Sequence, residues 1–309
     1  MFWPLDGSNI RATMSTAPPE IGQKARRGLG VYFAVLILGS AFLEWRILQT
    51  RELIGKHPGL ILMLMYTPTV ASVIARLALR EGFKDVSFRF GGRLGAKAAL
   101  LAWVYPLWVG FIAYGIAWTA RLAQFQAPIP QASRFFAANP TGNFLWAVLL
   151  TATVGTIFSC ASAAGEEIGW RGYMLTRLID AGVPKPVLVS GLIWGSWHLP
   201  LILSGQYATG AHPRISALLF LVDIVAAGYL AAYVRLKSGS VWPAVLFHGA
   251  WNAIIQAAFD RATVDKPLAV GESGYIVAAA SVLTVAWLVR RRWDMLRSPT
   301  EQMAAPGRF

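Results

Sequence analysis

Two adjacent glutamates follow one of the most apolar stretches of the chain. Glu166 and Glu167 come directly after 144–165, a run without a single charged residue. Ionisable side chains in such a segment are costly, which makes them candidates for function. Arg171 lies four residues after Glu167, so the two share a helical face and can pair. Glu166 points about 100° away from Glu167 and has no such neighbour. The spacing therefore predicts one structural and one reactive glutamate.

Two histidines and one asparagine lie in other apolar segments. His198 follows Trp194 by four residues, and Asn252 follows His248 by four, so His248 and Asn252 share a helical face. A single histidine in an apolar helix is more often a hydrogen-bonded structural residue than a catalyst. Two of them, together with an unpaired glutamate and an asparagine, favour a functional site.

The rise of a helix places these four side chains at similar depths. Counted from the expected cytoplasmic helix ends, the depths are roughly 18 Å for Glu166, 20 Å for His198, 12 Å for His248 and 18 Å for Asn252. The sequence therefore predicts that they share one layer, within the cytoplasmic half of the bilayer.

The elements that carry these residues are long and apolar. Of the 309 residues 56% are hydrophobic, 13 are tryptophan and the mean hydropathy is +0.50, which predicts an all-α polytopic membrane protein. About eight segments have the length that a bilayer requires. They are 29–49, 59–79, 96–119, 144–164, 186–205, 215–234, 241–259 and 274–289.

These segments divide the chain into four parts. Residues 1–28 contain no apolar core and are predicted to be a flexible cytoplasmic arm. Residues 29–143 hold the first three transmembrane helices, 144–259 the catalytic core of four helices, and 274–309 the last helix with a basic tail. The single cysteine, Cys160, excludes an intrachain disulfide and a cysteine-based zinc cluster, and we expect a buried thiol.

The basic residues indicate an orientation. The net charge is +13, but Lys and Arg are spread over loops, which argues against a nucleic-acid partner. With the N-terminus inside, twenty of the 28 Lys and Arg residues lie in inner segments. Both termini are therefore predicted to be cytoplasmic, in an integral membrane protein of the inner membrane if the source is bacterial.

Three ordered motifs resemble those of the CAAX-protease and bacteriocin-processing family of intramembrane proteases, also called Abi or type II CAAX prenyl endopeptidases. They are Glu166-Glu167 with Arg171, Trp194-x-x-x-His198, and His248-x-x-x-Asn252. The resemblance covers roughly 144–259. It implies a conical core of helices around an intramembrane cavity, and a membrane-associated or lipidated peptide or protein as substrate, with membrane lipid as the other partner.

The resemblance also implies roles for these residues. Glu166 would be the general base, with His198 holding the attacking water. His248 and Asn252 would stabilise the oxyanion, while Glu167, Arg171 and Trp194 would support the site.

Several alternatives stay open at this point. The family is often called a metalloprotease, and Glu166, His198 and His248 could form a zinc site. The chain could also be a catalytically idle immunity or scaffold protein, or a proton-coupled transporter. Asp223, acidic in the middle of the sixth apolar segment, could pair with a residue of the site or bind a neighbouring helix.

Overall fold

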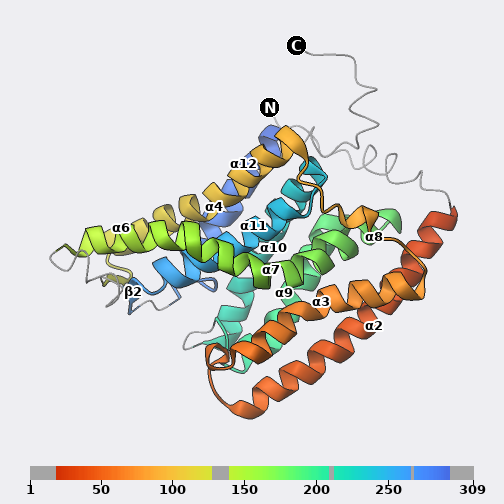
Figure 1. Cartoon of the computed structure of the whole chain (residues 1–309). Helices are drawn as coiled ribbons and strands as arrows, with labels where there is room; N and C mark the ends of the chain where they lie inside the picture. The colour runs from red at the N-terminus through yellow and green to blue at the C-terminus, as the bar shows by residue number, and fades with distance from the viewer. Residues whose placement is uncertain (1–18, 127–138, 209–211, 266–267, 293–309) are drawn as a thin grey trace.

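Helices make up nearly all of the computed structural model, which describes residues 19–126, 139–208, 212–265 and 268–292 (Figure 1). The α-helices are α2 (Pro19–Thr50), α3 (Pro58–Ala78), α4 (Gly92–Thr119), α6 (Pro140–Leu150), α7 (Thr156–Gly169), α8 (Leu175–Asp180), α9 (Pro186–Leu203), α10 (Pro213–Ser238), α11 (Trp242–Trp251) and α12 (Tyr275–Arg292). Short 3₁₀ turns are η1 (Ile54–Lys56) and η2 (Lys84–Val86), and π-helical turns are η3 (Thr151–Gly155), η4 (Trp170–Met174) and η5 (Asn252–Phe259). Two-residue strands β1 (Gln124–Phe125) and β2 (Thr263–Val264) pair antiparallel.

The lengths of the helices confirm the all-α membrane fold. Within the described residues, six helical segments are long and apolar enough to cross a bilayer: α2, α3, α4, the continuous helix from α6 to α8, α9 and α10. The other two expected spans are also helical. One is α11 continued by η5, and the other is α12, whose apolar described part, Tyr275–Leu288, is shorter.

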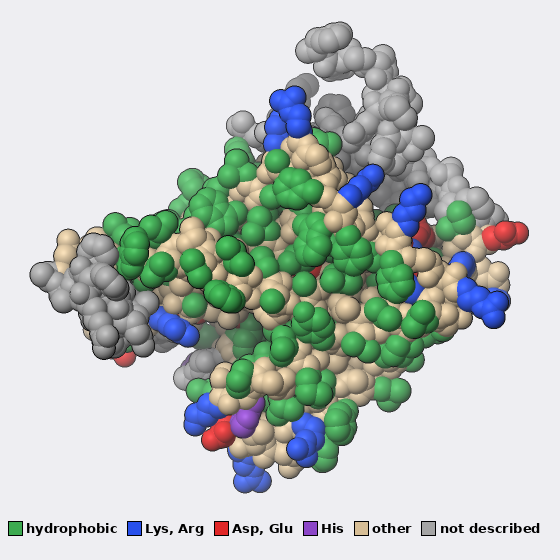
Figure 2. All heavy atoms as spheres, viewed as in Figure 1, with side chains coloured by type: hydrophobic (Ala, Val, Ile, Leu, Met, Phe, Trp, Pro, Cys, Tyr) green, Lys and Arg blue, Asp and Glu red, His purple; other side chains and the backbone are tan. Residues whose placement is uncertain are grey.

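The surface of the bundle is apolar where lipid would contact it. Leu38 of α2, Phe158 of α7 and Leu283 of α12 are each at least 70% exposed. Figure 2 shows hydrophobic side chains across the middle of the face in view, whereas Lys and Arg gather towards its edges. A contiguous apolar surface of this kind is stable only against a membrane or a partner.

The start of α2 differs from the predicted flexible arm. The helix begins at Pro19, so residues 19–28 are helical, and residues 1–18 lie outside the described part. Proline suits the first helical position because its fixed φ fits and its missing N–H would be unpaired there anyway. Tertiary contacts also hold this turn: Ala25 is buried, and Arg26 Nη1 donates to the Ala181 carbonyl at 3.1 Å.

Glycines allow the helices around the site to approach closely. A Cβ added to Gly228 of α10 would lie 3.1 Å from Gly191 Cα of α9. A Cβ added to Gly249 of α11 would lie 2.8 Å from the backbone nitrogen of Cys160 in α7. Small residues at such contacts are typical of packed membrane helices, and here they bring α7, α9, α10 and α11 together.

An ion-pair cluster fixes one end of the bundle. Arg76 at the end of α3 pairs with Asp85 of η2, and Arg177 of α8 lies 2.7 Å from Glu81 and 2.9 Å from Asp85. Burial raises the pKa of the Asp85 carboxyl, but the hydrogen bond from Arg76 and the charges of Arg76 and Arg177 outweigh it, so the pKa lies below its ordinary value.

This cluster predicts a pH-dependent contribution to stability. Because the pKa of Asp85 is lower in the folded state, its stabilising effect is present above the unfolded pKa of about 3.9 and is lost as the pH falls through the folded pKa. Asp85→Asn should lower the free energy of unfolding by at most about 1 kcal/mol at pH 7, because the side chain is 38% exposed. Thermal unfolding in detergent from pH 7 to pH 3 measures this, and a wild-type advantage that did not shrink on acidification would contradict it.

Candidate functional site

The candidate residues line one internal cavity of about 220 Å³. It is lined by Glu166, His198, His248 and Asn252, from α7, α9, α11 and the start of η5. The structure therefore brings together all four side chains that the depth estimate placed in one layer. Trp194 and Asp223 line the same cavity.

Glu166 is held by two indole groups. Its Oε2 accepts hydrogen bonds from Trp194 Nε1 at 2.8 Å and from Trp170 Nε1 at 3.2 Å, and the residue is only 2% exposed. Its Oε1 lies 4.0 Å from His248 Nε2, too far for a hydrogen bond. One carboxylate oxygen is thus fixed, whereas the other faces the cavity.

Glu167 has two partners. Its Oε1 lies 2.8 Å from Arg171 Nη1, the pairing that the spacing predicted, and 3.0 Å from His248 Nδ1. The Arg171 guanidinium also lies 4.1 Å from the Trp194 ring centre, a cation–π contact. All of these groups are buried. A row of alternating charge, Arg171–Glu167–His248–Glu166, results if the His248 ring is protonated on both nitrogens.

His198 has one ring nitrogen committed to the backbone. Its Nδ1 lies 2.9 Å from the Trp194 carbonyl oxygen. A carbonyl can only accept, so Nδ1 carries the proton and Nε2 of the neutral ring is an acceptor. The ring packs 4.8 Å from Trp197 and 5.0 Å from Phe220, centre to centre, which restricts its rotation.

Asn252 belongs to a polar chain that was not predicted from the sequence. Gln256 Nε2 donates to Asn252 Oδ1 at 3.2 Å and to Glu272 Oε1 at 2.9 Å. Glu272 also accepts from Trp251 Nε1 at 3.0 Å and from the Tyr207 hydroxyl at 2.6 Å. The only sequence signal was the four-residue spacing of Asn252 and Gln256, whereas nothing local marked Glu272 as buried.

Burial raises the pKa of Glu272, and the hydrogen bonds that its carboxylate accepts from Tyr207, Gln256 and Trp251 only partly offset this. The carboxylate therefore loses its proton at a higher pH than an exposed glutamate does.

Asp223 lines the cavity without an ion pair among the described residues. It is 3% exposed, and its Oδ1 has no hydrogen-bond partner in the described part of the chain. Of the two expectations for this residue, pairing with a histidine or arginine of the site is not found there.

The possible zinc ligands considered from the sequence, Glu166, His198 and His248, are not arranged as a metal site. Across the described ranges, no three His, Cys, Asp or Glu side chains are arranged to hold a metal ion. His198 Nδ1 and His248 Nδ1 both face protein acceptors, so only Nε2 of each ring could bind a metal, and His248 Nε2 lies 4.0 Å from Glu166 Oε1. In this arrangement the residues do not fit a zinc site.

Two π-helical turns adjoin the site. η4 begins at Trp170, shortly after Glu167, and carries Arg171, and η5 begins at Asn252. A π-helical turn rotates the faces of a helix relative to regular α geometry and is frequent at functional sites. Sequence periodicity alone did not indicate these turns.

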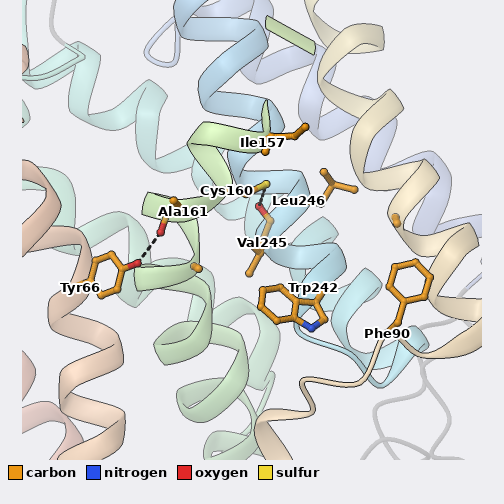
Figure 3. A pocket seen from close by; sticks show the side chains of 10 residues that line it. Tyr66, Phe90, Ile157, Cys160, Ala161, Trp242, Val245 and Leu246 are labelled. Atoms are coloured by element: carbon orange, nitrogen blue, oxygen red, sulfur yellow. Dashed lines mark hydrogen bonds between the residues drawn. The ribbon is translucent and has the colours of Figure 1, made fainter. Parts of the chain in front are cut away.

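A second hollow, of about 470 Å³, lies outside the site (Figure 3). Its lining is mostly apolar and includes Ile157, Cys160 and Trp242, none of which lines the cavity around Glu166. Cys160 is partly buried and its Sγ lies 3.7 Å from the Val245 carbonyl oxygen. None of the proposed catalytic residues lines this hollow.

A comparison with known families finds one match. Residues 141–254 match a family model described as type II CAAX prenyl endopeptidase, Rce1-like. This match over the core of the chain supports the resemblance to the CAAX-protease and bacteriocin-processing family. The match supports the interpretation that the protein is a membrane-bound protease. The matched residues include Glu166, His198, His248 and Asn252. They do not include Gln256 and Glu272. No curated protein matches the chain.

Proposed function

We propose that the protein is an intramembrane endopeptidase that hydrolyses a peptide bond of a membrane-associated or lipidated peptide or protein. The observation that carries this proposal is the state of Glu166. One oxygen is fixed by two indole N–H groups, and the other faces a cavity that His198, His248 and Asn252 also line.

Glu166 and His198 would activate the attacking water. Glu166 Oε1 takes a proton from the water as its oxygen attacks the peptide carbonyl carbon. His198 Nε2, an acceptor because Nδ1 is bound to the Trp194 carbonyl, holds the other water proton. Glu166 then delivers its proton to the leaving nitrogen, the C–N bond breaks, and a carboxylic acid and an amine result; transfer of the acid's proton to the amine gives the carboxylate and ammonium products.

His248 and Asn252 would bind the oxyanion. Glu167 accepts from His248 Nδ1, so Nε2 can donate only when the ring carries both protons. The carboxylates of Glu166 and Glu167 balance that positive charge. Because Asn252 Oδ1 is engaged by Gln256, its amide N–H groups are free to donate into the cavity. Donors fixed in advance in this way stabilise the transition state more than the ground state.

The proposal is tested by a comparison of protein termini. Membranes from cells that express the wild-type protein should contain new peptide termini, with ¹⁸O from labelled water in the new carboxylates. Cells that express His198→Ala at an equal level should lack them. An idle scaffold or a transporter would give identical termini in both, and that result would refute an endopeptidase.

The Gln256 contact predicts a selective effect on turnover. Gln256→Leu keeps the side-chain volume but removes the donor that orients Asn252, so kcat should fall by about tenfold while KM changes little. Steady-state kinetics on a cleaved peptide measure this. Gln256 is outside direct reach of the reacting atoms in this proposal, so a loss confined to KM would show that it binds substrate instead.

A further inference from the structure

The two ends of the helix bundle differ in charge. The end formed by the loops at 79–91, 181–185 and 239–241, here called the basic end, carries more Lys and Arg than Asp and Glu: Arg80, Lys84, Arg89, Arg93, Lys185 and Lys237 against Glu81, Asp85 and Asp180. The start of α2, the first described helix, and the end of α12, the last one, also lie at this end (Figure 1).

The opposite end, here called the rim end, consists of 51–57, 120–126, 204–208, 260–265 and 268–274 in the described chain. Its basic residues are accompanied by Glu52, Asp260 and Glu272, so it has no comparable excess of positive charge. Hydrogen bonds join its loops: Ile54 N donates to the Gln206 carbonyl at 3.1 Å, and Tyr207 donates to Glu272.

The cavity extends from the site to the rim end. Beyond Glu166 and His248 its lining continues to Tyr207, to Glu272 and finally to Gly55 in η1, which is exposed. No residue of the loops at the basic end is among its lining residues. On α9 and α10 the lining runs from near the middle of each helix, at Trp194 and Ala227, towards the end that adjoins the rim end.

We propose that the active-site cavity opens to the extracytoplasmic face of the membrane, and that the substrate is a peptide segment presented on that face. The positive-inside rule places the basic end in the cytoplasm, so the rim end faces outward. This inference concerns the substrate of the endopeptidase and rests on that proposed function. It differs from the depth estimate, which placed the site in the cytoplasmic half, because rise along a helix gives depth but not the direction in which a cavity opens.

Single cysteines at two matched glycines test the orientation. Cys160→Ser removes the only native thiol, and Gly55→Cys and Gly82→Cys then place one thiol at the rim end and one at the basic end. Both glycines are exposed, and an added Cβ meets nothing within 4 Å at either. In intact cells a membrane-impermeant maleimide should label Gly55→Cys at least about tenfold faster than Gly82→Cys, which should react only after permeabilisation. The reverse order would overturn the proposal.

A thiol inside the cavity tests the access route. In the same background, Asn252→Cys should react in intact cells with a small cationic methanethiosulfonate added outside, while Gly82→Cys stays unmodified. Reaction only after permeabilisation, or only after unfolding in detergent, would refute an outward opening. The labelling assay does not depend on peptidase activity. If the cavity reacted from outside but the protein cleaved no peptide, the proposed function would be refuted and the outward opening would stand.

Discussion

Glu166→Gln should abolish peptide hydrolysis, lowering kcat by about 10²–10⁴-fold, while the protein stays folded. The single amide oxygen of glutamine can still accept from Trp170 and Trp194, so the local packing survives. What is lost is the oxygen that takes the proton. Initial rates and thermal unfolding in detergent, measured on the same preparation, check both halves of this result.

Glu167→Gln provides the matched comparison, because it makes the same chemical change one residue away. Its carboxylate pairs with Arg171 and orients His248, both buried, so its loss should cost about 3–5 kcal/mol of stability. Arg171→Ala should destabilise similarly, since it leaves Glu167 without its cation. If Glu166→Gln lost as much stability as these two variants, the division between a reactive and a structural glutamate would be wrong.

Asn252→Ala should lower turnover by about a hundredfold or more, because it removes an amide donor aimed at the oxyanion. The expected loss falls on kcat, since the interaction strengthens only as negative charge develops. Gln256→Leu keeps the Asn252 amide but no longer orients it, so this variant should lower kcat less than Asn252→Ala does. Equal losses in the two variants would indicate that Asn252 acts through packing and not through its N–H groups.

Chelation separates this mechanism from a metal-dependent one. Activity of the wild-type enzyme should survive prolonged treatment with a strong chelator, because no three of the described His, Cys, Asp and Glu side chains are arranged to hold a metal ion. Zinc near one equivalent per chain, lost together with activity and restored on its return, would defeat the glutamate-activated water. In that case Asn252→Ala should leave the metal content unchanged and reduce turnover less.

The sequence alone determined the class of fold and pointed to the candidate site residues. Apolar segments of bilayer length predict membrane helices because each one must satisfy its own backbone hydrogen bonds. The pairing of Glu167 with Arg171 was also predictable, because four residues make slightly more than one helical turn. The motif order Glu166, His198, His248, Asn252 predicted the family, although not the contacts between these residues.

Only the tertiary structure decided how the candidate site is supported and which end of the bundle its cavity approaches. Glu167 meets His248 across 81 residues of sequence, and Trp194 meets Glu166 across 28. Such contacts depend on how packed helices are rotated about their axes, and the π-helical turns at η4 and η5 change that rotation. The buried Glu272 and the direction of the cavity depend in addition on how the loops at one end of the bundle fold together. Local periodicity carries no information about either.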